Sequence, residues 1–90
     1  MLNFGLLLPF RNPTEWKRSF ADIYSEHIDS AAYAEEIGYD TIWTTEHHFC
    51  EDGWSPSLLP ILSAIAARTK TIRIGTFVIV LPYHHPVRVA

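Results

Sequence analysis

The pattern of apolar and polar positions divides the chain into three strand-like and two helix-like segments. Residues 2–9 form a short, almost continuous apolar run that ends at a proline, and residues 39–44 and 71–81 are rich in aromatic and β-branched side chains. These runs predict three strands, of which the first is buried on both faces. Pro82 is expected to end the third strand.

A helix is predicted between the first two strands. Apolar side chains recur at helical spacing from Phe20 to Ala34. Ser19 or Asp22 can cap the start of this helix, and Gly38 suits the positive φ with which helices often end.

A second helix is predicted to begin at Pro56, with Ser55 as its N-cap and apolar side chains on most sides over residues 58–66. Pro86 is expected to begin a third helix. Strands and helices therefore alternate along the chain, which predicts an α/β protein with a parallel sheet and right-handed crossovers.

Composition narrows the class of protein. The chain has 90 residues, 48% of them hydrophobic and 19% charged, which allows one small domain with a core. One cysteine, Cys50, excludes an internal disulfide and favours a cytoplasmic location. The longest uncharged apolar run, residues 74–83, has half of the ~20 residues that a membrane span needs, and the N-terminus does not resemble a secretory signal.

The charges are unevenly distributed. The net charge of −3 gives no indication of a nucleic-acid partner. Residues 19–67 contain nine acidic side chains and no Lys or Arg, whereas residues 68–90 contain four basic side chains and no acidic one. We favour an acidic, solvated helix face followed by a basic turn; the alternative is a chain cut before its charges balance.

Candidate chemistry is concentrated after the predicted strands. Ligands of parallel α/β proteins bind at the carboxyl ends of the strands, which here lead into residues 9–13, 45–53 and 82–86. Four of the five histidines lie in the last two of these loops, as the adjacent pairs His47-His48 and His84-His85. Neighbouring strands would bring these side chains close together.

Acid–base chemistry is the favoured interpretation of His47. Histidine has an ordinary pKa of about 6.5, and Glu46 can orient one imidazole or raise its pKa. A buried strand would not otherwise end in such a costly polar cluster. For His84 and His85 we favour a structural role, namely capping the helix that Pro86 begins.

A metal site is the alternative interpretation, since His and Glu side chains suit zinc or iron. Adjacent residues on extended backbone point to opposite sides, so His47 and His48 are not expected to hold one ion. We therefore expect no metal, while a metal-dependent hydrolase using Glu46, His47, His84 or His85 stays open as an alternative.

Three further features have modest implications. Gly75 lies inside the third strand, where it permits the close approach of a ligand or backbone, or else marks a bulge. Cys50 has no activating neighbour, and the tryptophans are expected to be packing residues. No glycine-rich loop that would bind phosphate is present.

Two stretches carry a resemblance to a known family. Residues 34–49 contain Glu-His-His-Phe at 46–49, and residues 74–88 contain Leu-Pro-Tyr-His-His-Pro-Val-Arg at 81–88. In this order and spacing they resemble the N-terminal part of the bacterial luciferase-like flavin-dependent monooxygenases, which are (β/α)8 TIM barrels. The resemblance implies that residues 1–90 are an N-terminal fragment of one such domain, without a second domain and with the barrel not closed.

The resemblance also implies a chemistry. Reduced FMN from a separate flavin reductase would react with O2 to oxygenate a small organic substrate; in a close variant, a deazaflavin would transfer hydride instead. His47 matches the family's active-site histidine, with Glu46 in a supporting catalytic role and His48 in a lesser role beside the substrate. A homo-oligomer is expected.

A non-proline cis peptide bond beneath the flavin ring is a further implication, at Phe77–Val78. Thr76, Phe77 and Val78 are then the expected cofactor contacts. The residues that match Phe77 and Val78 in the light-emitting subunit are small, so we expect a general monooxygenase rather than light emission. The 90-residue chain itself would expose strand edges, which allows a different class of function: a non-catalytic fragment that associates with itself.

Overall fold

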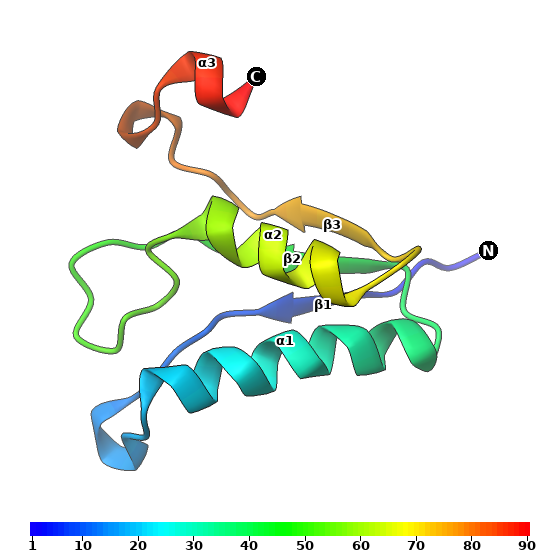
Figure 1. The fold of residues 1–90 in the computed structure, drawn as a ribbon, viewed down its shortest axis with the longest axis horizontal. Coiled ribbons are helices and arrows are strands. Elements are labelled where there is room, and N and C mark those ends of the chain that lie inside the picture. The colour runs from blue at the N-terminus through cyan, green and yellow to red at the C-terminus, as the bar shows by residue number, and fades with distance from the viewer.

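The computed structural model describes residues 1–90 and contains one parallel sheet with helices packed against it (Figure 1). The three strands lie in the order β1-β2-β3, and they are β1 (Gly5–Leu8), β2 (Thr41–Thr44) and β3 (Arg73–Thr76). The helices are α1 (Phe20–Glu36), α2 (Leu58–Arg68) and the short α3 (Pro86–Val89). The expected α/β class, an open arc of parallel strands, is confirmed.

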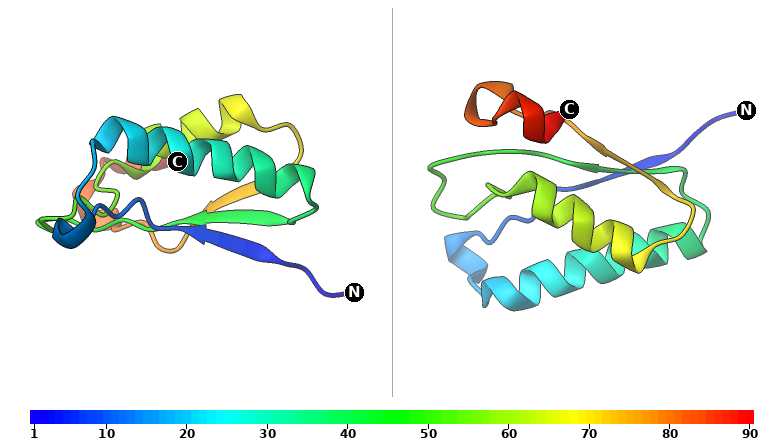
Figure 2. Two further views of the ribbon diagram at one scale, coloured as in Figure 1. Left: turned by 90° about the horizontal axis from the view of Figure 1, so that it is seen from below. Right: turned by 45° about the horizontal axis from the view of Figure 1, so that its top comes forward.

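Both long helices cover the same face of the sheet, and the other face is open (Figure 2). The core between helices and sheet consists of Leu8, Phe10, Ala31, Ala34, Ile42, Ile61 and Ile65. On the open face, Leu7 of β1 is 47% exposed. Burial of the first strand on both faces was therefore a wrong expectation, because no element of the chain covers that side.

The start and end of α1 agree with the sequence. Ser19 is the N-cap, and its hydroxyl oxygen accepts a hydrogen bond from the backbone N–H of Asp22 at 3.1 Å. Gly38, just beyond the helix, has a φ of 93°. This conformation is costly for residues with a side chain, which explains why glycine ends the helix.

The strands are shorter than their apolar runs. The first two pair over four residues each, from Gly5 opposite Thr41 to Leu8 opposite Thr44. The third was expected over residues 71–81 but ends at Thr76, because β2 ends at Thr44 and the ladder has no partner beyond it. The chain then turns through residues 77–80 into a 3-10 turn, Leu81–Tyr83, so Pro82 lies in that turn rather than at the end of a strand.

The start of α2 also differs from the expectation. The helix begins at Leu58 with Ser57 as its N-cap, two residues later than predicted. Ser55 is instead fully buried, with a φ of 43°. Its hydroxyl donates to the carbonyl oxygens of Thr45 at 2.6 Å and Pro9 at 3.3 Å, so it joins two loops rather than capping a helix.

Gly75 allows the close approach of the Trp43 side chain. A Cβ atom at Gly75 would lie 2.6 Å from Cζ3 of the Trp43 indole, and one at Gly5 would lie 2.8 Å from its Nε1. The indole therefore lies across both neighbouring strands on the open face. The expected packing role is confirmed for Trp43.

Glu35, at the end of α1, binds the turn that precedes β3. Its carboxylate accepts hydrogen bonds from the backbone N–H groups of Thr71 at 2.6 Å, Ile72 at 2.7 Å and Lys70 at 2.9 Å. These bonds lower the pKa of Glu35 to about 2. Nearby, Arg68 pairs with Asp29, so part of the acidic segment meets part of the basic one. No helix has both the length and the apolar character needed to cross a bilayer.

Candidate active site at the carboxyl ends of the strands

The loops that follow β2 and β3 meet at the carboxyl ends of the strands, as the topology predicts. The segment after β2 carries Glu46, His47 and His48, and the two histidines make separate contacts. His48 contacts Glu46 and the loop after β3, whereas His47 contacts Trp54 in its own loop. The adjacent histidines therefore belong to two groups of side chains: the first is centred on Glu46, and the second contains His47 and Trp54.

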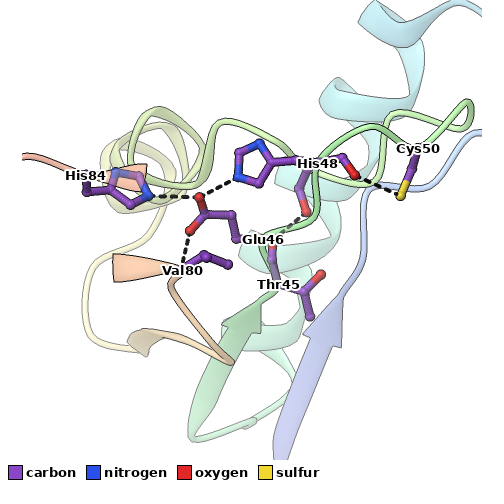
Figure 3. Close-up of polar contacts among 7 residues, drawn as sticks. Thr45, Glu46, His48, Cys50, Val80 and His84 are labelled. Carbon is purple, nitrogen blue, oxygen red and sulfur yellow. Dashed lines mark hydrogen bonds and ion pairs between the residues drawn. The ribbon is translucent and has the colours of Figure 1, made fainter. Parts of the chain in front are cut away.

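Glu46 is the centre of the first group (Figure 3). Its side chain is completely inaccessible to solvent. One carboxylate oxygen, Oε2, accepts a hydrogen bond from the backbone N–H of Val80 at 2.7 Å. The other, Oε1, lies 2.7 Å from Nε2 of His48 and 2.8 Å from Nε2 of His84.

The ionised form of Glu46 is favoured by these partners. Burial by itself raises the pKa of Glu46, but the hydrogen bonds from Val80, His48 and His84 outweigh it and hold the pKa below its ordinary value. An ionised carboxylate only accepts hydrogen bonds, so both Nε2 atoms must carry a hydrogen. Only the Nδ1 atom of each ring is then left for other partners.

The two histidines after β3 have different roles. His85 is the N-cap of α3, and its Nδ1 accepts the backbone N–H of Val87 at 3.3 Å, as expected. His84 was expected to share this capping role, but its ring contacts Glu46 instead. That expectation is wrong for His84, because the turn at Leu81–Tyr83 directs its side chain toward the loop after β2.

His47 belongs to the second group. Its imidazole is stacked on the indole of Trp54, with ring centroids 3.7 Å apart and an interplanar angle of 20°. The guanidinium carbon of Arg11 lies 4.5 Å from the centroid of the same indole, and Arg11 pairs with Asp52 at 2.5 Å. A half-buried imidazole is thus held flat beside an aromatic surface, with no hydrogen bond to Glu46.

The loops around His47 are held by buried polar contacts. Asn12 is 2% exposed; its side chain bonds to both the N–H and the carbonyl of Arg18, at 2.9 and 2.7 Å. Its backbone N–H donates to the carbonyl oxygen of Asp52 at 2.9 Å. The loop after β1 therefore supports the loop that carries His47 and Trp54.

The segment after β3 contains a cis peptide bond between Phe77 and Val78, as the family resemblance implied. The side chains of these residues are 65% and 64% exposed. The ring system of a flavin has flat aromatic faces, so two exposed apolar side chains fit against such a face. The chemistry of these two side chains therefore suits the face of a flavin ring.

A metal centre has little support in the side-chain geometry. No group of three or more His, Cys, Asp or Glu side chains is placed to hold a metal ion. The four ligands weighed for a hydrolase also make separate contacts: Glu46 meets His84, whereas His47 stacks on Trp54 and His85 caps α3.

Comparisons with known proteins identify the class. The chain superposes on two solved structures: the oxygenating constituent of 3,6-diketocamphane monooxygenase from Pseudomonas putida, a type II Baeyer-Villiger monooxygenase in complex with FMN, and the monooxygenase RslO1 from Streptomyces bottropensis. Both give a TM-score of 0.84, with 27% and 32% identity over 99% and 98% of this chain. The matched parts are 24% and 27% of those proteins. The fold is therefore part of a luciferase-like barrel.

Residues 2–90 match the sequence profile of the luciferase-like monooxygenases. The chain belongs to this family. It is also 46% identical, over 52 residues, to the alkanal monooxygenase alpha chain of Aliivibrio fischeri, a match that covers 58% of this chain and 15% of that protein. The chain thus spans about a quarter of the length of the structural relatives it matches.

Two functional candidates escaped the sequence analysis. His84 was expected near this loop but was assigned a capping role, so its hydrogen bond to Glu46, 38 residues away, was missed. Trp54 was grouped with the packing residues, yet it stacks on the candidate catalytic histidine. Its position in the loop after the second strand, seven residues beyond His47, was the one signal available.

Proposed function

We propose that these residues form part of a flavin-dependent monooxygenase that uses reduced FMN and O2 on a small organic substrate. The observation that carries the proposal is the placement of His47 at the carboxyl end of β2, with the exposed Phe77 and Val78 at the end of the neighbouring β3. A structural relative in complex with FMN supports the choice of flavin. When bound, reduced flavin supplies the electrons that activate O2.

The residues of this chain have distinct proposed roles. His47 holds or moves one proton near the reacting atoms, a task that suits an imidazole. Thr76, Phe77 and Val78 contact the flavin ring and help to exclude water from it. Glu46 supports catalysis indirectly, through its hydrogen bonds to neighbouring residues. The side chain of His48 is 25% exposed and borders the substrate.

The proposal extends to partners and to the extent of the domain. We infer that residues 1–90 are the N-terminal part of one luciferase-like domain, since they match about a quarter of each structural relative. Reduced flavin would come from a separate reductase, and the protein would act as a homo-oligomer in the cytoplasm. Phe77 and Val78 favour a general monooxygenase over light emission.

Anaerobic titration with reduced FMN tests the cofactor. We expect saturable binding, measured by the absorbance and fluorescence of the flavin, and consumption of one O2 per oxygenated substrate when air is admitted. A reduced deazaflavin titrated in parallel is expected to bind more weakly. Absence of reduced-FMN binding contradicts the proposal, and tighter deazaflavin binding would replace it with the hydride-transfer variant.

A second candidate function concerns the 90-residue chain by itself. Leu7, Trp43 and Phe77 on the open face are 47%, 39% and 65% exposed, and β1 and β3 are both edge strands. Such surfaces favour association with another copy. Sedimentation equilibrium of the chain is expected to give a mass above 10.3 kDa; a stable monomer would exclude this candidate.

A further inference from the structure

The segment Phe77–Val80, which carries two of the proposed flavin contacts, is anchored at both ends to the end of β2. At its start, the backbone N–H of Phe77 donates to the carbonyl oxygen of Thr44 at 2.7 Å. At its end, the backbone N–H of Val80 donates to Oε2 of Glu46, also at 2.7 Å. Between these anchors the side chains of Phe77 and Val78 remain exposed. The path of the segment therefore depends on where the Glu46 carboxylate lies.

Glu46 is itself held through its other oxygen. Oε1 has two partners, His48 and His84 (Figure 3). His48 belongs to the same loop as Glu46, so it orients the carboxylate only locally. His84 comes from the loop after β3 and is the partner that ties the carboxylate to the far side of the segment.

The ring of His84 is free for this task because the cap of α3 is supplied by His85. The ring of His48 packs at an interplanar angle of 76° against the ring of Tyr83, the residue before His84, with ring centroids 4.7 Å apart. The two loops thus meet through an aromatic contact and a shared carboxylate at adjacent positions. Both contacts fix the approach of His84 to Glu46.

We propose that His84 is a positioning residue, which acts through Glu46 to fix the segment Phe77–Val80 against the flavin. The inference rests on the proposed function for its consequence, namely flavin affinity, but the positioning itself concerns this chain alone. His84 donates from Nε2 to Glu46, Glu46 accepts from Val80, and the segment is held in place. Neither His84 nor Glu46 needs to touch the flavin.

Amide hydrogen exchange of the 90-residue chain tests the positioning directly. His84→Ala removes one of the bonds to Glu46, so we expect exchange at the Val80 amide to speed up about tenfold, as expected for weakening a charge-assisted bond. His84→Gln keeps an N–H donor at a similar reach and is expected to restore slow exchange. The matched control is His85→Ala, which removes a cap of α3 and is expected to leave the Val80 amide unchanged.

Two results would overturn the positioning role. One is unchanged Val80 exchange in His84→Ala; the other is an equal effect from His85→Ala. Should His84→Ala fail to fold, the 15N chemical shifts of the His84 imidazole in the parent chain provide the test. The proposal requires that neutral His84 carries its hydrogen on Nε2. A hydrogen on Nδ1 alone would contradict it.

Reduced-FMN affinity tests the consequence for the cofactor. We expect His84→Ala to raise the dissociation constant about tenfold and His85→Ala to leave it unchanged. A parent protein that does not bind reduced FMN would refute the proposed function, while the exchange experiment would still judge His84. An unaltered dissociation constant in His84→Ala, with faster Val80 exchange, would refute the link to the flavin.

Discussion

The imidazole of His47 lies nearly parallel to the indole of Trp54, with 3.7 Å between the ring centroids. The stack places the proposed proton-transfer residue by contact with an aromatic surface rather than by a hydrogen bond to Glu46. Stacking restricts the tilt of the imidazole and leaves its nitrogens available. The orientation of His47 therefore depends on a residue that has no acid–base chemistry of its own.

Replacing Trp54 should release His47. In Trp54→Leu the ring current of the indole is lost, so the Cε1 proton of His47 should move downfield in the NMR spectrum. Trp54→Phe keeps an aromatic face and should retain part of the upfield shift, and Trp16→Leu, at a 78% exposed position, should leave His47 unaffected. Identical His47 spectra in the parent chain and Trp54→Leu would contradict the stack.

His47 should be the most sensitive position for turnover. If it transfers a proton in the oxygenation, His47→Ala should lower kcat by about a hundredfold or more, since general acid–base groups contribute on that scale. Oxygen uptake with reduced FMN measures the effect. His27→Ala is a poor control because its ring packs on buried Phe10, whereas His85→Ala lies outside the proposed site and should retain turnover.

Glu35 should make stability depend on pH in the acidic range. Its pKa is about 2 in the folded chain and 4.5 ordinarily, so its contribution is complete above pH 4.5 and is lost as the pH falls toward 2. Urea denaturation at several pH values should show the parent more stable than Glu35→Gln at neutral pH, with the difference shrinking through that range. Glu36→Gln, at the next and exposed position, is the control: its stability difference from the parent should not shrink as the pH falls.

The contact between Gly75 and Trp43 can be measured by a double-mutant cycle. Gly75→Ala places a Cβ atom 2.6 Å from the indole and should destabilise the chain by about 1–3 kcal/mol, the usual cost of overpacking. In a Trp43→Leu background the same change should cost less, because the indole is gone. Equal costs in both backgrounds, measured by urea denaturation, would show that the two residues are independent.

The buried side chain of Asn12 should contribute more to the stability of the fold than an exposed polar side chain does. Asn12→Ala leaves the N–H and carbonyl of Arg18 without their partner, so the free energy of unfolding should fall by about 1–3 kcal/mol. Asn3→Ala, at an exposed position, should change it by less than about 0.5 kcal/mol. A loss no larger than that of Asn3→Ala would mean that the buried contacts of Asn12 add nothing.

Local signals in the sequence predicted much of the fold. Ser19 and Gly38 mark the ends of α1 because capping depends on residues within a few positions of the helix end. Ser55 misled for the opposite reason: its hydroxyl bonds to Thr45 and Pro9, and the latter lies 46 residues away. The end of β3 was missed because it depends on where the neighbouring strand stops.

The sequence predicted which loops form the candidate site and that they lie close together, but not which side chains pair between them. His47 and Glu46 follow a strand directly, so strand-end logic and the family motif both indicate them. The partnership of Glu46 with His84 depends on the path of the chain after Thr76, which the apolar run 71–81 concealed. A run of apolar residues does not reveal that Val80 donates its N–H to a carboxylate.

The indole of Trp43 also determines how the strands align. Gly75 lies directly opposite Trp43 on β3, and the neighbours of Gly75 on the same face are Arg73 and Phe77. Sliding β3 by two residues along β2 would keep the same face inward but bring one of these larger side chains against the indole. The indole of Trp43 and the missing side chain of Gly75 thus oppose misaligned pairing of β2 with β3. The carboxyl ends of these two strands, and the loops bearing Glu46 and His84, are thereby kept next to each other.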